Sequence, residues 1–253
     1  MVPAYPEPRN LLQGKSVLIT AAAGTGIGFS TALRCVEEGA RVFISDIHDR
    51  RLGEAVDRIA AKTGRRPSAL PCDVTKEEQV RALVEAAGTI DVLVNNAGLG
   101  GSAPIVEMTD EQWSRVLDVT LTSVFRMTRA VLPGMYARGS GIIVNNASVL
   151  GWRAQSLQAH YAAAKAGVMA FTRCAAMEAA PHGVRINAVA PSIAMHEFMN
   201  RVSDAKLLAE LSQREAFGRS AETWEIANVI VFLASDLSSY MTGEIVSVSS
   251  QRA

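Results

Sequence analysis

The feature that most constrains the fold of this chain is a regular alternation of short apolar segments with longer amphipathic ones. The first pair shows the pattern: residues 16–20 are apolar, and residues 29–40 place Ala32, Leu33 and Val36 at helical spacing. Strand-like segments occupy residues 16–20, 41–46, 68–73, 90–98, 141–148, 184–191 and 243–250, and helix-like segments occupy residues 29–40, 50–64, 76–88, 111–139, 160–183 and 224–236. Such alternation is typical of a parallel sheet with helices on both faces and right-handed crossovers. The sequence therefore predicts an α/β fold with a doubly wound parallel sheet of about seven strands.

We expect one folded domain over residues 14–253, because neither a repeat nor a low-complexity linker interrupts the alternation. Residues 1–13 contain three prolines and are expected to form an N-terminal arm, without the apolar core of a signal peptide. The one irregular region is residues 191–223, which follows a strand-like segment. Loops at the carboxyl ends of strands carry ligand binding in such sheets, so we expect this region to be a substrate lid.

Charge and cysteine content argue against several kinds of partner. Lysine plus arginine and aspartate plus glutamate both number 25, so there is no basic excess to bind a nucleic acid. Cys35, Cys72 and Cys174 are isolated, which favours reduced thiols over a disulfide framework or a metal site. No apolar run approaches the length of a membrane span. We therefore expect a cytoplasmic protein that acts on a small molecule, with no nucleic acid, membrane or metal.

A glycine-rich loop, TAAAGTGIG at residues 20–28, joins the first strand-like segment to the first helix-like segment. Glycine lets the backbone approach a pyrophosphate, whose charge is stabilised at a helix N-terminus. Glycine-rich turns are common, but this position between a strand and a helix is typical of dinucleotide binding. We therefore expect the sheet to be a single-domain fold of the Rossmann type.

Five motifs in this order resemble the short-chain dehydrogenase/reductase family. They are the glycine-rich loop, NNAG at residues 95–98, Ser148, the Tyr161-x-x-x-Lys165 pair, and NAVAP at residues 187–191. The resemblance covers almost the whole chain from Gly14 onward. It implies an oxidoreductase that transfers hydride between a nicotinamide cofactor and a secondary alcohol or ketone. It also implies a homotetramer.

The resemblance further implies which residues contact the cofactor. The loop departs from the usual family pattern, because Ala21 replaces the first glycine, and Gly26 and Gly28 lie one residue farther from Thr20. The expected contacts are Gly24, Thr25 and Ile27 in the loop, Asp46, Cys72, Asp73 and Val74 around the adenosine, Asn96, Ala97 and Gly98 at the adjoining ribose, and Tyr161, Lys165, Pro191, Ile193 and Ala194 toward the nicotinamide.

Asp46, at the end of the second strand-like segment, favours NAD over NADP. A carboxylate there accepts hydrogen bonds from the ribose hydroxyls and repels a 2′-phosphate. The glycine-rich loop also offers no arginine or lysine for that phosphate. An aspartate that caps the next helix is the alternative role, and it is compatible with the first. Arg50 and Arg51 leave NADP open.

The resemblance implies that Ser148, Tyr161 and Lys165 form the catalytic site. Positions four apart share one face of a helix, so the side chains of Tyr161 and Lys165 can point the same way. A free tyrosine has a pKa of about 10, and we expect the Lys165 ammonium and the cofactor to lower it. Ser148 would then orient the substrate oxygen. The alternative is an amphipathic surface helix, which does not explain the matching serine.

Three further positions matter because they depart from the family pattern or stand close to the pair. Thr120 falls where the family has a relay asparagine, so it either substitutes for that residue or the relay differs. His160 is more typical of a wall or capping residue than of a second acid or base. His196 falls at a threonine position, and the alternatives are a cofactor contact, recognition of an acid or thioester, or a solvent-facing side chain.

The lid and the loop after Ser148 are rich in apolar side chains, which favours a bulky, mostly apolar substrate. These residues are Met195, Phe198, Met199, Val202, Leu207 and Leu208 in the lid and Trp152 in the loop. A hydroxyacyl thioester or a ring or steroid-like ketone would fit such a cover. Two alternatives remain, namely an NADPH-dependent 3-oxoacyl thioester reductase and a non-catalytic dinucleotide-binding scaffold.

Overall fold

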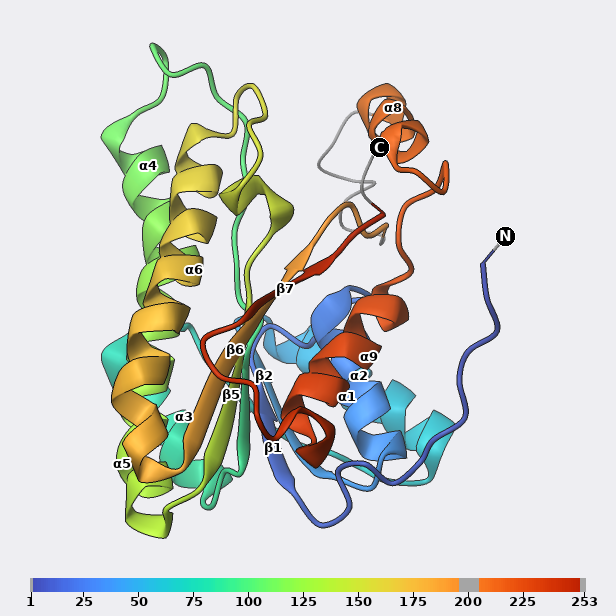
Figure 1. The fold of residues 1–253 in the computed structure, drawn as a ribbon, viewed down its shortest axis with the longest axis vertical. Helices are drawn as coiled ribbons and strands as arrows, with labels where there is room; N and C mark the ends of the chain where they lie inside the picture. The colour runs from blue at the N-terminus through green and yellow to red at the C-terminus, as the bar shows by residue number, and fades with distance from the viewer. Residues whose placement is uncertain (1, 196–204, 251–253) are drawn as a thin grey trace.

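A computed structural model describes residues 2–195 and 205–250, and it contains the predicted parallel sheet (Figure 1). Seven parallel strands lie in the order β3-β2-β1-β4-β5-β6-β7. The strands are β1 (Ser16–Ile19), β2 (Arg41–Asp46), β3 (Ser68–Pro71), β4 (Val92–Asn95), β5 (Gly141–Asn146), β6 (Val184–Pro191) and β7 (Ile245–Val248). The helices are α1 (Ile27–Glu37), α2 (Asp49–Thr63), α3 (Glu77–Ala87), α4 (Asp110–Leu117), α5 (Ser123–Arg138), α6 (Ala159–Ala179), α8 (Ala205–Arg214) and α9 (Thr223–Ala234). The predicted fold class and strand number are confirmed.

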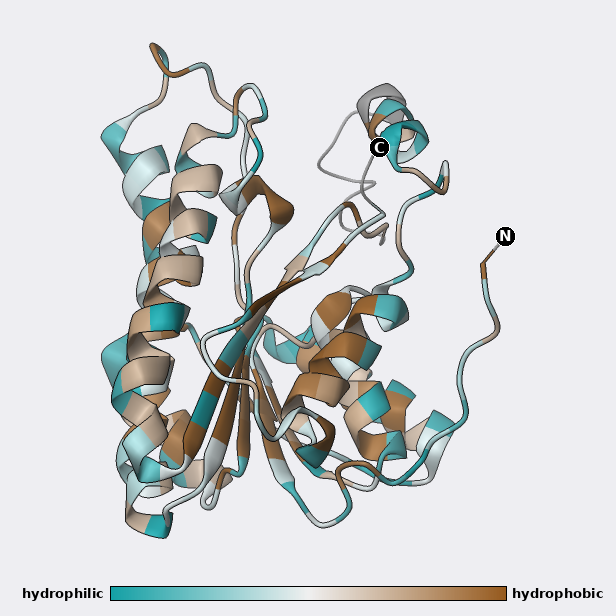
Figure 2. Ribbon diagram, in the orientation of Figure 1, coloured by the Kyte–Doolittle hydropathy of each residue, from teal (hydrophilic) through white to brown (hydrophobic). Residues whose placement is uncertain are grey.

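Helices cover both faces of the sheet, with α1, α2 and α9 on one face and α3, α5 and α6 on the other (Figure 1). Strand β5 shows why: Ile142 and Val144 pack with the first group of helices, whereas Ile143 packs with the second. Successive side chains of a strand point to opposite faces, so a buried strand must be apolar on both. Figure 2 shows the central strands as mostly hydrophobic and the outer helix faces as mixed.

The order of the strands positions the site. Strand β1 pairs with β2 on one side and with β4 on the other. The chain therefore builds β2 and β3 to one side of β1 and then crosses back to place β4 on the other side. A crevice opens at such a switch point, outside the carboxyl ends of the strands. Asp46, Asn95 and Asn146 end their strands at this edge.

The stretch at residues 111–139 is helical as predicted, but it is not one regular helix. Helix α4 ends at Leu117, a π-helical turn covers Asp118–Thr122, and α5 begins at Ser123. π-Turns are rare and often lie at functional sites. This turn buries Thr120, whose hydroxyl accepts from the Leu99 N–H at 3.0 Å and donates to the Leu99 carbonyl at 3.1 Å. Thr120 therefore fastens the segment after NNAG to the helix.

The N-terminal arm is held by a buried ion pair on α1. Arg34 and Glu38 pair at 2.5 Å, and Glu38 accepts from the backbone N–H groups of Arg9 and Leu11, both at 2.9 Å. The ring of Tyr5 meets that of Trp224 edge to face at 5.4 Å. The arm thus packs on the layer of α1 and α9, outside which its trace runs in Figure 1.

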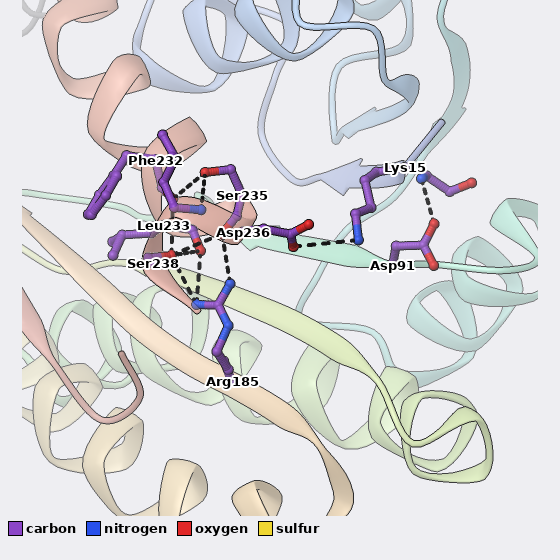
Figure 3. Close-up of polar contacts among 10 residues, drawn as sticks. Lys15, Asp91, Arg185, Phe232, Leu233, Ser235, Asp236 and Ser238 are labelled. Carbon is purple, nitrogen blue, oxygen red and sulfur yellow. Dashed lines mark hydrogen bonds and ion pairs between the residues drawn. The ribbon is translucent and has the colours of Figure 1, made fainter. Parts of the chain in front are cut away.

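Arg185 lies near the amino end of β6, at the side of the sheet opposite the carboxyl ends of the strands (Figure 3). Its guanidinium donates to the carbonyls of Leu233, Ser235 and Met241 and to the hydroxyl of Ser238. The last carbonyls of a helix lack partners within the helix, and a cation placed there satisfies them. This network therefore fixes the end of α9 against the sheet. Within the described part of the chain, no helix is both long and apolar enough to cross a membrane.

Candidate active site

The structure brings Ser148, Tyr161 and Lys165 together at the carboxyl edge of the sheet. Ser148 follows β5, where its Oγ accepts from the Leu150 N–H at 3.2 Å. The Ser148 side chain lies near enough to the Tyr161 hydroxyl to lower its pKa, and Lys165 Nζ lies 5.6 Å from the centre of the Tyr161 ring. One turn of α6 separates Tyr161 from Lys165, as predicted from their spacing. A hydroxyl, a phenol and an amine therefore face one small volume.

Burial controls the electrostatics of this group. Desolvation raises the pKa of Tyr161 to about 12, although the Ser148 side chain lowers it in part. Burial outweighs the effect of Ser148, so this pKa is raised, whereas the sequence predicts that the Lys165 ammonium and the cofactor together lower it. Desolvation also lowers the pKa of Lys165 to about 8. At neutral pH the phenol therefore carries its proton, as a proton donor must.

Lys165 reaches across the end of β5 from α6. Its side chain is 3 % exposed, and Nζ donates to the backbone carbonyl of Asn146 at 2.5 Å. A Cβ at Gly98 would lie 3.5 Å from Nζ, so NNAG passes close to the amine. His160, beside Tyr161, is buried, and its Nε2 would lie 3.2 Å from a Cβ at Gly101. This placement agrees with a wall residue.

The glycine-rich loop is tied to NNAG. The Thr20 hydroxyl accepts from the N–H groups of Asn96 and Ala97, both at 3.0 Å, and Asn96 Nδ2 donates to the carbonyls of Thr20 and Ala21 at 3.2 and 3.0 Å. A Cβ at Gly28 would lie 2.4 Å from both the Ala21 oxygen and Asn96 Nδ2, so no side chain fits there. Ala21 itself has a φ of 53°, the left-handed region that favours glycine. The family's usual glycine at this position therefore has a conformational reason.

The first turn of α1 is suited to an anion. Gly26 is the N-cap residue and offers no side-chain oxygen to the first amides of α1, while a Cβ at Gly24 would meet only Gly26 N at 3.8 Å. Unpartnered amides and the helix dipole favour a phosphate at such a terminus. Thr25 and Ile27, two of the expected phosphate contacts, stand on either side of Gly26. The loop therefore fits a pyrophosphate.

Arg58, which the sequence reasoning missed, also reaches the loop. It comes from α2, with its guanidinium 4.1 Å from the centre of the Phe29 ring and Nη1 donating to the Gly24 carbonyl at 3.4 Å. The linear loop motif holds no arginine, and only the packing of α2 beside α1 brings this one near. It adds positive charge beside the expected phosphate position.

Asp46 lies where the sequence placed it, at the end of β2. Its carboxylate accepts from the Ala23 N–H at 3.2 Å and from the His48 N–H at 3.0 Å. Burial raises the pKa of Asp46 above its usual value, and the hydrogen bond from Ala23 and the charge of Arg51 offset only part of that rise. Its hydrogen bonds therefore join the glycine-rich loop to the segment that leads into α2. Arg50 pairs with Glu54 on the surface of α2, at 2.5 Å.

The other predicted cofactor contacts line the same edge. Asp73 borders a cavity of about 640 Å³ together with Ile47 and Thr75. Its other lining residues come from α4 and the π-turn, namely Trp113, Ser114, Arg115, Leu117, Asp118, Val119 and Thr122. Val74 is buried next to Asp73, and Cys72 precedes them. A cavity of this volume is large enough for an adenine ring.

The base of the expected lid is pinned to the chain beyond it. After Pro191 ends β6, Ile193 accepts from the Ala221 N–H at 2.9 Å, and Ala194 bridges to Ala221. Leu208 on α8 is buried. His196, Phe198, Met199 and Val202 lie outside the described residues, as does the side chain of Leu207. The lid itself stays a prediction.

Comparisons with known proteins agree with this geometry. The family model described as Enoyl-(Acyl carrier protein) reductase matches residues 21–250. The chain is 60% identical over 248 residues to (5R,7aS)-5-hydroxy-7a-methyl-1-oxo-2,3,5,6,7,7a-hexahydro-1H-indene-carboxyl-CoA reductase of Mycobacterium tuberculosis, covering 95% of this chain and 94% of that protein. It is 40% identical over 242 residues to the 3-oxoacyl-[acyl-carrier-protein] reductase FabG of Thermotoga maritima, covering 94% and 97%.

Solved structures agree as well. A short chain dehydrogenase from Mycobacterium smegmatis matches with a TM-score of 0.88 and 59% identity, covering 100% of this chain and 99% of that one. A 3-oxoacyl-[acyl-carrier protein] reductase from Brucella melitensis, solved with bound NAD, matches with a TM-score of 0.89 and 32% identity, covering 98% and 95%. The chain belongs to the short-chain dehydrogenase/reductase family, and it is an oxidoreductase that transfers hydride between a nicotinamide dinucleotide and a secondary alcohol or ketone.

Proposed function

We propose that this protein is an NADH-linked reductase of a ring ketone carried on a coenzyme A thioester. The observation that carries the reaction is the convergence of Ser148, Tyr161 and Lys165. The substrate class is supported by the relative that is 60% identical over nearly its whole length and is named for an indene-carboxyl-CoA compound. Trp152, 51 % exposed on the loop after Ser148, offers an apolar surface next to the site for such a ring.

The roles of the three residues follow from their surroundings. When bound, the nicotinamide dinucleotide supplies the hydride for the carbonyl carbon. Ser148 donates a hydrogen bond to the carbonyl oxygen and orients it. Tyr161 then donates its phenolic proton to that oxygen, which becomes the hydroxyl of a secondary alcohol. The Lys165 ammonium lies close enough to stabilise the phenolate left behind and to bind the nicotinamide ribose.

Asp46 supports NAD over NADP. Its carboxylate accepts from two backbone N–H groups, which fix its position at the end of β2. A 2′-phosphate beside it would meet like charge, whereas two ribose hydroxyls would donate to it. The related structure solved with bound NAD agrees with this preference.

The test is turnover of purified protein with NADH and NADPH against three substrates: a bicyclic ketone as its CoA thioester, the same ketone as the free acid, and a linear 3-oxoacyl-CoA. We expect the first with NADH to give the highest kcat/KM. Tyr161→Phe should abolish turnover and leave NADH binding nearly unchanged, because the ring remains and only the proton donor is lost. Retained turnover in that variant would refute the role of Tyr161.

A second candidate is an NADPH-linked 3-oxoacyl thioester reductase, favoured by the relative that is 40% identical. A clear preference for NADPH and the linear thioester would select it. Asp46→Ala tests whether the Asp46 carboxylate sets the cofactor preference. If it does, the kcat/KM values with NADH and with NADPH should become more similar in this variant. NADH binding without turnover of any substrate would instead favour a non-catalytic scaffold, against which the intact catalytic residues argue.

We also propose a homotetramer in the cytoplasm. Trp113 on α4 and Phe125 on α5 expose large apolar side chains on the outer surface of their layer, a pattern found at subunit interfaces. Cys35, Cys72 and Cys174 are free thiols, which fits a reducing compartment. Sedimentation that finds a monomer would contradict the assembly, and fractionation tests the location.

A further inference from the structure

Asn146, the last residue of β5, occupies the space between the glycine-rich loop and Lys165. Its backbone carbonyl accepts from Lys165 Nζ at 2.5 Å, and its side-chain Nδ2 donates to Asn96 Oδ1 at 2.9 Å. Asn96 in turn donates to the carbonyls of Thr20 and Ala21. One residue thus connects the catalytic amine to the phosphate loop.

The side chain of Asn146 lies on the face of the sheet that α1 and α9 cover. Along β5, Ile142 and Val144 pack in the apolar cluster of α1 and α9, and Asn146 continues that alternation at the carboxyl edge. Asn145 points the other way, where it accepts from Asn95 and donates to Thr172. The two neighbouring asparagines therefore belong to different networks.

One polar atom of the Asn146 side chain, Oδ1, has no hydrogen-bond partner among the described residues. This atom is buried, and the residue is only 9 % exposed. Asn95 Oδ1 is unpartnered too, but Asn95 is 2 % exposed and lies under α5, with Thr128 as a neighbour, where no ligand can reach. A buried acceptor without a donor costs stability, and an aliphatic side chain such as that of Val144 would avoid this cost. An acceptor without a partner at the carboxyl edge of the sheet, where the ligand is expected, indicates a donor on the ligand.

We propose that Asn146 is a positioning residue whose Oδ1 accepts a hydrogen bond from the nicotinamide riboside half of the dinucleotide. This inference rests on the proposed function, because it needs the cofactor of that reaction. The backbone carbonyl of the same residue accepts from Lys165 Nζ. Asn146 would therefore fix the position of the catalytic amine through its backbone and that of the nicotinamide riboside through its side chain.

The test uses binding, with turnover as a separate measurement. Dissociation constants of NADH, ADP-ribose and ADP are measured by calorimetry for the wild type, Asn146→Leu and Asn146→Ser. We expect the NADH constant to rise about tenfold in both variants, the effect of losing one good hydrogen bond. ADP affinity should be unchanged, since ADP lacks the nicotinamide riboside.

ADP-ribose identifies the donor. A loss for both NADH and ADP-ribose supports a ribose hydroxyl, and a loss for NADH alone supports the carboxamide. Unchanged NADH affinity, or an equal loss for ADP, would overturn the proposal. A wild type that binds no NADH would instead overturn the proposed function.

Asn145→Leu is the matched control, on the same strand but facing α5 and α6. It should lower the melting temperature without changing any of the three dissociation constants. The serine variant guards against misfolding of the leucine variant, because it is smaller and remains polar. A control variant that weakens NADH as strongly as Asn146→Leu would also count against the proposal.

Discussion

Lys165 leaves a signature in the pH dependence of stability. Its ammonium is buried, and desolvation lowers its pKa from 10.5 to about 8. In the unfolded chain the amine regains its ordinary pKa, so between these values the unfolded chain binds more protons than the folded one. The free energy of unfolding must therefore rise with pH across this window, at about 1.4 kcal/mol per pH unit. Across the whole window the gain is on the order of 3 kcal/mol, and at neutral pH it is absent.

Lys165→Met isolates this contribution because methionine binds no proton. At neutral pH the variant should be about 1–2 kcal/mol more stable than the wild type, since removing a desolvated charge outweighs the lost hydrogen bond to Asn146. From about pH 8 upward the wild type should gain on the variant by about 1.4 kcal/mol per pH unit. The same change should abolish turnover, so stability and activity move in opposite directions.

The assay is urea unfolding followed by circular dichroism, at one protein concentration, from about pH 7 to about pH 9.5. Subtracting the variant from the wild type at each pH cancels the tyrosines and cysteines that titrate in the same range. Lys76→Met, at an exposed position before α3, serves as the control and should show no such trend. A difference between wild type and Lys165→Met that stays flat over this range would refute the reasoning.

Three further outcomes are expected. Ala21→Gly should stabilise the protein by up to about 1 kcal/mol in urea unfolding, because Ala21 has a φ of 53°; a loss of stability would contradict the strain. Arg58→Ala should raise the dissociation constant of NADH about threefold to tenfold and weaken its salt dependence, since it removes one charge beside the loop; an unchanged salt dependence would place the phosphates elsewhere. Tyr5→Ala should cost about 1–2 kcal/mol by removing the contacts with Trp224 and Arg34 while leaving kcat/KM unchanged; unchanged stability would mean that the arm is held by Arg34 and Glu38 alone.

The fold could be predicted because the apolar side chains of each strand show in the sequence itself that the strand is buried. Residues 41–46 and 184–191 match β2 and β6 to the residue, since apolar side chains run on both faces and glycine or charge marks the ends. The π-turn at residues 118–122 could not be predicted, because its sequence continues the helical spacing on both sides. Only the pairing of Thr120 with the Leu99 backbone, which depends on the tertiary structure, shows why the helix changes there.

Some residues of the candidate site could be predicted from the sequence, and others could not. Ser148, Tyr161 and Lys165 were predictable because the chemistry needs these residue types and their spacing puts two of them on one helix face. Asn146 and Arg58 were not, because both act through contacts between elements that are distant in sequence. A signal for Asn146 does exist: asparagine pairs end both β4 and β5, and polar pairs at the ends of buried strands are costly unless they are used.

The charges that this fold buries identify the functional edge without any motif. Among the described residues, three ionisable side chains of the Arg, Glu and Lys types are fully buried: Arg34, Glu38 and Lys165. Arg34 and Glu38 neutralise each other and also bind the N-terminal arm, so their burial has a structural explanation. Lys165 pairs with no carboxylate in the described part of the chain; its ammonium donates to the Asn146 carbonyl and lies near the Tyr161 ring. These contacts compensate only weakly for removing an ammonium from water. A fold that keeps such a lysine beside a tyrosine with a raised pKa accepts lower stability at the place where it transfers a proton.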